Sequence, residues 1–412
     1  MPRAQVLLSE SIHASADDAF ERAGIAVHRS TAGLGIEELI AALNALPGDG
    51  PVMLGVRSKT KVRAAVFEAV PRLAGIGAFC IGTDQIDLEV AAAHGVAVFN
   101  APFSNTRSVA ELVLAELIFL SRQIFGRSWS AHEGEWRKDA RGAHEVRGKT
   151  LGIIGYGHIG SQLSVLAEAL GLRVIYHDVV NKLPLGNANV APSLDALLAE
   201  ADFVSLHVPN TAETRGMFGA AQMAKMKAGA YLINASRGTV VDIEALRDAI
   251  VDGRLGGAAV DVFPSEPKAA GDRFESPLQG LREVILTPHI GGNTQEAQAN
   301  IGLEVSEALS AYIQTARTTA CITLPGVDAP ALRADGGCRL LNIHRDVPGV
   351  LSAVNQAVAG VGLNIRGQRL ETRAGVGLLL MDVDVPREDP RAEQLRASLA
   401  ALDHSVRTRL LE

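Results

Sequence analysis

Cysteine is scarce in this chain of 412 residues, which contains three, at positions 80, 321 and 338. Cys80, Cys321 and Cys338 lie far apart and show no metal-ligand spacing, so we expect no metal site and interpret each as a reduced, buried small residue. No apolar stretch approaches the roughly 20 residues that a bilayer-spanning helix needs. The apolar run near the N-terminus is too short for a signal peptide. These absences predict a cytoplasmic protein.

The chain also lacks an excess of basic residues. Lys and Arg number 39 against 46 Asp and Glu, for a net charge of −7. This balance argues against non-specific nucleic-acid binding, although it does not exclude a local basic pocket for a small anion. Aromatic residues amount to 4% and glycines to 41 residues. Abundant glycine together with many Val, Ile, Leu and Ala residues is typical of an α/β protein with many strand-to-helix turns.

Short apolar runs alternate with helical stretches along most of the chain, which predicts parallel strands joined by crossover helices. The first such unit covers about residues 4–103, and a second opens at Gly148. Helical patterns are predicted at 36–46, 59–70, 108–130 and 294–316, and a Pro- and Gly-containing linker follows at 322–332. The length of the chain predicts two to four domains.

The last part of the chain, about residues 337–412, has a different pattern. We predict strands in RLLNIHR, NIRGQRLET, VGLLLMDVDV and SVRTRLL, and helices at 349–361 and 390–402. The resulting order, βαββαβ, is the ferredoxin-like arrangement.

A G-x-G-x-x-G pattern, GYGHIG at 155–160, indicates a dinucleotide site. The pattern is weak alone, but it follows the strand-like LGIIG and opens a helix-like stretch. Asp178 ends the next strand, 18 residues after Gly160. Glycines allow the backbone to approach a pyrophosphate at a helix N-terminus, and a carboxylate at this place accepts hydrogen bonds from ribose hydroxyls. Asp178 would repel the phosphate of NADP, so the cofactor is predicted to be NAD. The pattern residues placed at the cofactor are Gly155, Gly157, His158, Ile159 and Gly160.

Three later segments place charged residues at the ends of predicted strands: NASRG, DVFPSEP and TPHIGG. Hydride transfer from an alcohol carbon needs a base, a cation for the substrate carboxylate, and a partner for the base. His289 suits the first role because its unperturbed pKa is near 6.5. Arg237 matches a carboxylate bidentately, and Glu266 can orient the ring. Taken singly, such an Arg is often a surface ion pair and a lone His is usually structural.

The segments NASRGTVVD, AAVDVFPSEP and LTPHIGG resemble the three signatures of the D-isomer-specific 2-hydroxyacid dehydrogenases. The resemblance covers nearly the whole chain. It implies that Arg237, Glu266 and His289 are the catalytic set, with His289 as proton donor and acceptor. It also implies further contacts with NAD, which are His207, Val208, Pro209, Ala235, Ser236, Arg237, Asp261, His289, Ile290, Gly291 and Gly292.

Within this family the segments GVRSKTKV, CIGTDQIDL and FNAPFSNTRSVAEL resemble the branch that oxidises 3-phospho-D-glycerate. The predicted substrate-binding residues are Arg57, Ser58, Lys59, Gly82, Asn105 and Lys138. A phosphate on the substrate favours basic residues in the pocket. Arg57 and Lys59 can also be read as ordinary helix-start charges, and Lys138 is weaker still.

The segment HRDVPGVL at 344–351, followed by GLNI at 362–365, resembles the amino-acid-sensing ACT pattern. His344, Asp346 and Asn364 match its serine-contacting positions, so L-serine is the expected effector. The best-known pattern has Asn where this chain has Asp346, and an ionised Asp would repel a serine carboxylate. The alternative is a domain used only for oligomer contacts.

With the resemblance, we interpret the chain as an α/β protein. A Rossmann-type NAD domain (105–291) is inserted in a flavodoxin-like substrate domain (1–104 and 292–333), and a ferredoxin-like ACT domain follows (334–412). The expected reaction is NAD-dependent oxidation of 3-phospho-D-glycerate to 3-phosphohydroxypyruvate in serine synthesis. The resemblance also implies a homotetramer and reduction of 2-oxoglutarate. The alternatives are a glyoxylate or hydroxypyruvate enzyme of the same family, a non-catalytic NAD-sensing regulator, and a serine sensor for a partner protein.

Overall fold

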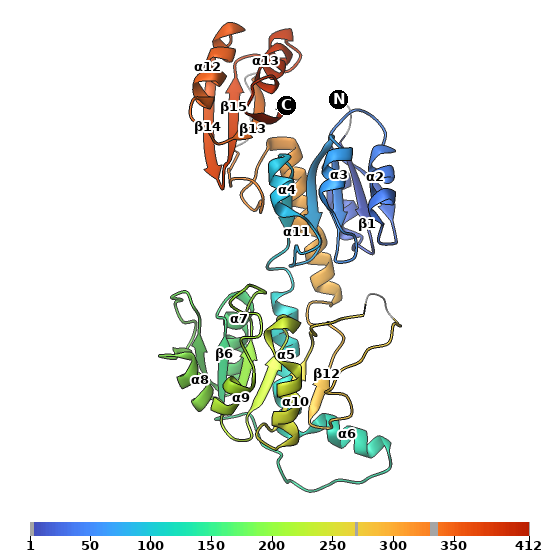
Figure 1. Cartoon of the computed structure of the whole chain (residues 1–412), viewed down its shortest axis with the longest axis vertical. Helices are drawn as coiled ribbons and strands as arrows, with labels where there is room; N and C mark the ends of the chain where they lie inside the picture. Colours follow the sequence, from blue (N-terminus) through green and yellow to red (C-terminus); the bar gives the residue numbers. More distant parts are fainter. Residues whose placement is uncertain (1–3, 268–270, 330–336, 412) are drawn as a thin grey trace. The chain divides into compact units, whose positions relative to one another are not determined.

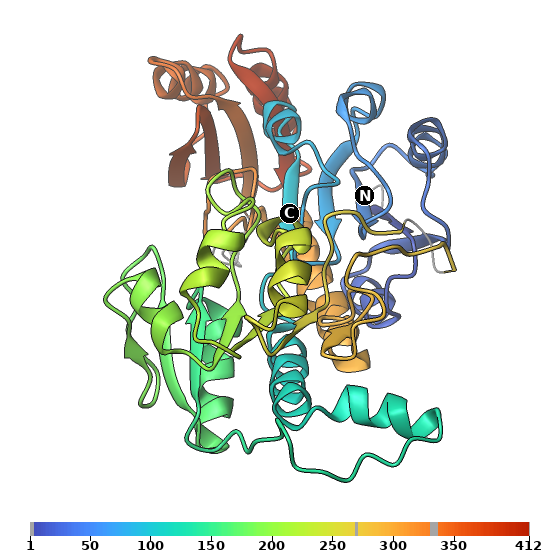
Figure 2. The same ribbon diagram turned by 60° about the horizontal axis from the view of Figure 1, so that its bottom comes forward.

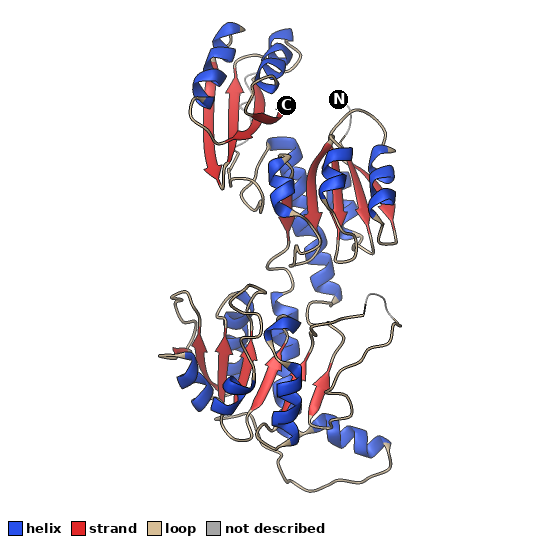
Figure 3. Cartoon of the chain, viewed as in Figure 1, coloured by secondary structure: helices blue, strands red, loops and turns tan. Residues whose placement is uncertain are grey.

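Three β-sheets organise the residues that the structure describes (Figure 3). The structure is a computed structural model that describes residues 4–267, 271–329 and 337–411. It divides into two units, one formed by Met1–Ser104 with Gln298–Glu412 and the other by Asn105–Ala297. None of the described helices is both long and apolar enough to cross a bilayer. The finer domain boundaries drawn from the sequence stay predictions.

The first sheet has five strands in the order β2-β1-β3-β4-β5, all parallel (Figure 1). This is the flavodoxin-like order, as predicted. The strands are β1 (Gln5–Ser9), β2 (Ala26–Ser30), β3 (Val52–Val56), β4 (Leu73–Ala78) and β5 (Ala97–Asn100).

Helices cover both faces of this sheet, which explains its nearly continuous apolar strands. Alternate side chains of β1 enter different cores, with Leu8 on the side of α1 and α11 and Leu7 on the side of α2, α3 and α4. The helices are α1 (Ser15–Arg22), α2 (Ile36–Asn44), α3 (Ala64–Ala69), α4 (Leu88–Ala93) and α11 (Gln295–Thr315). The helix predicted at 59–70 is wrong at its start, because Val62 forms a parallel bridge with Ile86.

The second unit holds a seven-stranded parallel sheet in the order β12-β11-β10-β9-β6-β7-β8. The order of connection reverses between β6 and β9, and ligands of such sheets bind at the carboxyl ends beside that reversal. The Rossmann-type prediction is confirmed. The strands are β6 (Thr150–Ile154), β7 (Arg173–His177), β8 (Asn189–Val190), β9 (Phe203–Leu206), β10 (Tyr231–Asn234), β11 (Gly257–Val260) and β12 (Val284–Leu286).

Helices lie on both faces of the second sheet as well (Figure 2). One core includes Val113 and Leu163 from α5 and α7, and the opposite core includes Leu197, Met223 and Leu246 from α8, α9 and α10. The helices are α5 (Thr106–Arg122), α7 (His158–Ala169), α8 (Leu194–Glu200), α9 (Ala220–Lys225) and α10 (Ile243–Val251), with a short 3₁₀ turn η1 (Gly238–Val240).

The single helix predicted at 108–130 is wrong. Gln123 adopts a left-handed conformation with φ 53°, which ends α5 and starts a separate helix, α6 (Ile124–His132). The apolar periodicity continues across the break, so the pattern did not reveal it. Arg127 of α6 then donates to the carbonyls of Arg137, Asp139 and Arg141 and holds the following loop against this helix.

The C-terminal residues form an antiparallel sheet in the order β14-β15-β13-β16, which confirms the βαββαβ prediction. One face packs under its own helices through Leu340 and Met381, and the other shares a core with the first sheet through Leu341 and Leu380. The elements are β13 (Cys338–Arg345), α12 (Val350–Gly360), β14 (Ile365–Arg373), β15 (Val376–Val383), α13 (Pro390–Ala400) and β16 (Ser405–Leu411).

The linker predicted at 322–332 is packed rather than loose over its described part. Leu324 and Val327 are buried in the core that the first sheet shares with the C-terminal domain. Positions 330–332 lie outside the described residues.

Candidate active site

The glycine-rich loop follows β6 at the carboxyl edge of the seven-stranded sheet. Gly155 has φ 92°, and a side chain there would clash with the carbonyl of His207. A Cβ at Gly160 would clash with the carbonyl of Gly155, whereas a Cβ at Gly157 would meet no protein atom within 4 Å. The first and third glycines therefore let the turn close, and the middle one faces open space at the start of α7, where an anion would approach.

Asp178 lies directly beside this loop. Its Oδ2 accepts the amide of Tyr156 at 2.8 Å and its Oδ1 accepts the amide of Val180 at 2.9 Å. These bonds aim the half-buried carboxylate along the edge of the sheet, where a ribose would lie.

His207 follows β9 on the other side of the reversal point. Its Nε2 bonds Ser205 at 2.8 Å, while its buried Nδ1 has no hydrogen-bond partner among the described residues. Burial lowers the pKa of His207 to about 4, so the ring is neutral. The glycine cradle, the aimed carboxylate and this orphaned nitrogen together fit the adenosine half of NAD.

The remaining predicted residues of this half lie in the same region. His158 and Ile159 form the first turn of α7, with His158 exposed and Ile159 packed on the core. Val208 packs against the core on the side of α8, α9 and α10, and the carbonyl of Pro209 accepts the hydroxyl of Thr214.

The turn after β10 positions Arg237. Buried Asn234 accepts the amide and the hydroxyl of Ser236 and donates to the carbonyl of Arg237 at 3.1 Å. The guanidinium donates to the carbonyl of Ser236 at 2.8 Å. Gly238 follows because a Cβ there would clash with the backbone of Phe263. Asn234 belongs to the NASRG motif, but the sequence pattern does not mark it as a positioning residue. Ala235 lies half-buried between Asn234 and Ser236.

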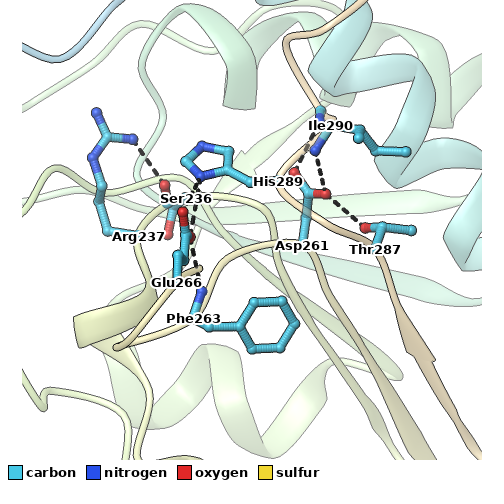
Figure 4. Close-up of polar contacts among 9 residues, drawn as sticks. Ser236, Arg237, Asp261, Phe263, Glu266, Thr287, His289 and Ile290 are labelled. Carbon is cyan, nitrogen blue, oxygen red and sulfur yellow. Dashed lines mark hydrogen bonds and ion pairs between the residues drawn. The ribbon is translucent and has the colours of Figure 1, made fainter. Parts of the chain in front are cut away.

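Glu266 and His289 meet at this edge (Figure 4). Oε2 of Glu266 lies 2.9 Å from Nδ1 of His289, and Oε1 accepts the amide of Phe263 at 3.1 Å. The hydrogen bond that His289 donates to Glu266 outweighs burial and raises the pKa of His289, while the charge of Arg237 acts in the opposite direction. Burial opposes ionisation of Glu266, yet the bonds from His289 and Phe263 lower the pKa of its carboxyl group overall.

Buried Asp261 organises the loop that carries His289. Its carboxylate accepts the Thr287 hydroxyl at 2.6 Å and the amides of Ile290 and Gly291 at 2.8 Å each. His289 itself has φ 54°, a conformation that costs free energy in a non-glycine residue. Asp261 therefore offsets the strain, and its carboxylate is turned towards the protein backbone. The sequence interpretation did not foresee Thr287.

Glu116, on α5 behind this loop, was also missed. It is buried, and neither of its carboxyl oxygens has a hydrogen-bond partner among the described residues. Burial and the charge of Asp261 raise the pKa of Glu116 to about 8. In the sequence Glu116 looks like an ordinary charged residue on the exposed side of a helix. The only sequence signal for its burial is its position in the helical repeat, which places it on the apolar face of α5.

Of the two predicted substrate residues in this unit, one lies near the catalytic loop. A Cβ at Gly292 would clash with the side-chain amide of Asn105, which precedes α5. Lys138 is not brought there. It is exposed in the loop held by Arg127 of α6, and Gly126 of that helix packs against Arg282, before β12, at the amino end of the sheet. Within one chain, the structure therefore does not bring Lys138 to this group, and its role in binding substrate stays a prediction.

The other predicted substrate residues lie in the first unit, after β3 and β4. Glu10, which has φ 71° and is buried, accepts the amides of Arg57, Lys59 and Thr60 and shapes their loop. Ser58 and Lys59 are exposed, and Gly82 accepts the thiol of Cys80 at 3.1 Å. Cys80 is half-buried, so the prediction of burial is wrong for this cysteine and holds for the other two.

Known proteins resemble this chain over nearly its whole length. Residues 114–291 match the D-isomer specific 2-hydroxyacid dehydrogenase, NAD binding domain. D-3-phosphoglycerate dehydrogenase of Haemophilus influenzae is 47% identical over 98% of this chain and 96% of its own. The protein of that name from Dictyostelium discoideum is 45% identical over 99% and 97%. The chain belongs to the D-isomer-specific 2-hydroxyacid dehydrogenase family. Among solved structures, a glyoxylate reductase from Paecilomyes thermophila is 28% identical, with a TM-score of 0.68 over 78% of this chain and 99% of that one.

In this dehydrogenase a small cavity of about 140 Å³ opens in the C-terminal domain. His344 lines it, and its Nδ1 bonds Asn342 at 3.0 Å. Asp346 and Asn364, the other predicted effector residues, are exposed and do not line this cavity. A Cβ at Gly377 would clash with the ring of His344, so the glycine on β15 leaves room for the histidine.

Proposed function

We propose that this dehydrogenase oxidises 3-phospho-D-glycerate to 3-phosphohydroxypyruvate with NAD, in L-serine synthesis. The observation that carries the proposal is the 2.9 Å contact of His289 with Glu266 beside Arg237, at the edge of an NAD-binding sheet. The substrate is proposed from the relatives, because proteins named D-3-phosphoglycerate dehydrogenase match this chain over 96–97% of their own length.

His289 acts as the base in the proposed mechanism. Glu266 bonds Nδ1, which fixes the proton on that nitrogen and leaves Nε2 to accept the substrate hydroxyl proton. Glu266 then stabilises the imidazolium that forms. Bound NAD, which Gly155, Gly157 and Asp178 would hold, would supply the acceptor for the hydride on the carbon that bears the hydroxyl. Arg237 binds the substrate carboxylate and polarises the developing carbonyl.

The phosphate end of the substrate is assigned to the first unit. The loop shaped by Glu10 presents the side chains of Arg57 and Lys59, and Ser58 and Gly82 supply backbone at the carboxyl ends of β3 and β4. Asn105 is the proposed contact from the second unit.

The C-terminal domain is proposed to be an ACT domain that senses an amino acid, with L-serine as the effector. The support is its βαββαβ order and the placement of His344 beside a cavity at the start of α12. Asp346 and Asn364 would complete the site across a subunit interface in a homotetramer. Reduction of 2-oxoglutarate is proposed as a side activity.

The decisive experiment compares NAD reduction with 3-phospho-D-glycerate and with D-glycerate. We expect kcat/KM to be at least about 100-fold higher for the phosphorylated substrate, since it adds charge-assisted bonds worth about 1.5–3 kcal/mol each. The variant His289→Ala should abolish turnover of both. Preference for glyoxylate or unphosphorylated hydroxypyruvate would overturn the substrate assignment, and absence of NADH formation would favour a regulator.

A further inference from the structure

A second cavity, of about 1070 Å³, lies within the first unit, between β16 of the C-terminal domain and segments around the first sheet. It is far larger than the cavity beside His344, and its volume is close to the upper end of the roughly 300–1,000 Å³ that ligand pockets occupy. Its walls come from the end of α11, the turn after α1, the segments before β3 and β4, and β16. It is thus distinct from the carboxyl edge of the NAD sheet.

The cavity is lined by many cations. Five arginines line it, against one acidic residue, Asp49. The arginines are Arg72, Arg387, Arg396, Arg407 and Arg409. Arg396 is neutralised by Glu393, but the other four form no ion pair with any described residue. In a protein with a net charge of −7, this concentration of positive charge is a local feature.

Two of these guanidinium groups are held in place and left short of partners. Arg407 donates to the carbonyl of His94, and Arg409 donates to the carbonyl of Ile313 at 2.7 Å and lies over the ring of Tyr312. Nε of Arg407 and Nη1 of Arg409 are shielded from solvent and have no partner in the described chain. Burial and the neighbouring Arg409 lower the pKa of Arg407. A shielded cation without a counter-charge is costly.

Arg339 lies on the same face of the C-terminal sheet and is a structural arginine whose charge is paired. In the antiparallel pairing of β13 with β16, Arg339 lies opposite Leu411, and Arg409 opposite Leu341, so these side chains share a face. Arg339 is buried and pairs bidentately with Asp382 at 2.7 and 2.8 Å. Arg407 and Arg409 occupy the same face without such a carboxylate. The charge of Arg407 and Arg409 is therefore not balanced by a described carboxylate.

We propose that this cavity binds a small phosphate-bearing anion, held by Arg407 and Arg409 and surrounded by Arg72 and Arg387. Arginine pairs bidentately with phosphate, and two guanidinium groups two residues apart on one strand present parallel sets of donors. A bound anion would join the C-terminal domain to the first sheet within the first unit. The inference does not depend on the proposed dehydrogenase substrate.

The test follows amide hydrogen exchange of the full chain with inorganic phosphate, pyrophosphate or 3-phospho-D-glycerate, at constant ionic strength. 3-phospho-D-glycerate would also bind in the active site. Exchange is therefore measured peptide by peptide, so that protection at this cavity is distinguished from protection at the active site. We expect pyrophosphate to slow exchange saturably in the peptide covering 405–411. Comparing the three ligands shows whether the cavity prefers an inorganic phosphate or a phosphorylated metabolite.

Two variants remove cavity cations, and a third is the control. Arg409→Gln and Arg387→Gln should each weaken the pyrophosphate effect at least tenfold. Arg387→Gln is less disruptive to folding, because among the described residues its side chain bonds only the carbonyl of Leu410. Arg391→Gln, on α13 but outside the cavity, should leave it unchanged. No saturable protection, or equal weakening in all three variants, would overturn the proposal.

Discussion

Oδ2 of buried Asp261 accepts the backbone amide of Gly291 at 2.8 Å, although the two residues are 30 positions apart in the chain. The same carboxylate also bonds Ile290 and Thr287, so one side chain holds the loop on both sides of His289. The position of the proposed base therefore depends on a residue that does not touch its ring.

Replacing Asp261 by Asn should lower kcat/KM by about 10- to 100-fold, because Asn keeps one acceptor oxygen and turns a donor towards backbone amides, at a cost of about 1.5–3 kcal/mol. Steady-state kinetics measure the change in kcat/KM, and NADH titration measures binding of the cofactor. Thr287→Val removes one of the three bonds and should have a smaller effect. Equal effects would mean that the carboxylate is not what holds the loop.

The pair of Glu266 and His289 predicts a pH dependence of oxidation. A protonated ring cannot accept a proton, so the rate falls below the pKa of His289, which Glu266 raises. In Glu266→Gln that pKa falls, and the acid limb of log kcat/KM should move to lower pH as the rate drops. Glu275→Gln, in an exposed pair with Arg273, should leave the profile in place. A shift to higher pH would contradict the assigned roles.

Glu116 predicts a pH dependence of stability. Its pKa is about 8 in the folded chain against 4.5 in the unfolded chain. The contribution of Glu116 to the free energy of unfolding is fully present below pH 4.5. It is lost as the pH rises through 8, and the loss reaches about 4–5 kcal/mol. Glu116→Gln stays neutral, so it should be more stable than the parent at pH 9, with little difference at pH 5. Denaturant unfolding measures this. Glu111→Gln, exposed on the same helix, should follow the parent at both pH values.

The glycine loop offers a matched pair of variants. Gly155→Ala places a methyl group on the carbonyl of His207 at positive φ, so both NAD binding and stability should fall, the latter by about 1–3 kcal/mol. Gly157→Ala meets no protein atom within 4 Å, so it should keep its stability and lose only affinity for NAD. Thermal unfolding with and without NAD separates the two. Unchanged affinity in Gly157→Ala would argue against the loop as the pyrophosphate site.

The charge of Asp346 should set the serine concentration needed for the proposed inhibition. Asp346→Asn replaces a repelling carboxylate by an amide that can donate to the carboxylate of serine, so half-inhibition should occur at about tenfold lower serine. Inhibition curves of NADH formation measure it. Glu371→Gln, exposed on β14, is the control for a general change of charge. Weaker inhibition in Asp346→Asn would show that the acid binds the ammonium group instead.

The fold was largely predictable, because parallel strands and crossover helices leave a periodic signal. That signal located Gly155, Asp178 and Arg237 at strand ends. It could not show the break at Gln123, where the apolar pattern continues while the backbone turns left-handed. Periodicity records which face is buried and not the backbone angle at one residue.

The supports of the site were harder to predict than its reactive groups. Glu10 and Asp261 are acidic residues that accept backbone amides from distant loops, and nothing in a linear pattern pairs an acceptor with amides 30 or 50 positions away. Glu116 reads as a solvated charge until packing around α5 is known. Lys138 is predicted as a substrate residue, but the fold of one chain places it in the loop held by Arg127.

The core shared by the first sheet and the C-terminal domain has a consequence for engineering. Ile343, Leu378 and Leu411 pack in one cluster with Phe20 and Tyr312. A shortened enzyme that stops before β13 would expose this apolar surface to water. We expect it to aggregate rather than to remain a soluble, active enzyme without regulation. Any sensor grafted in its place would have to bring a matching apolar face, not just a flexible tether.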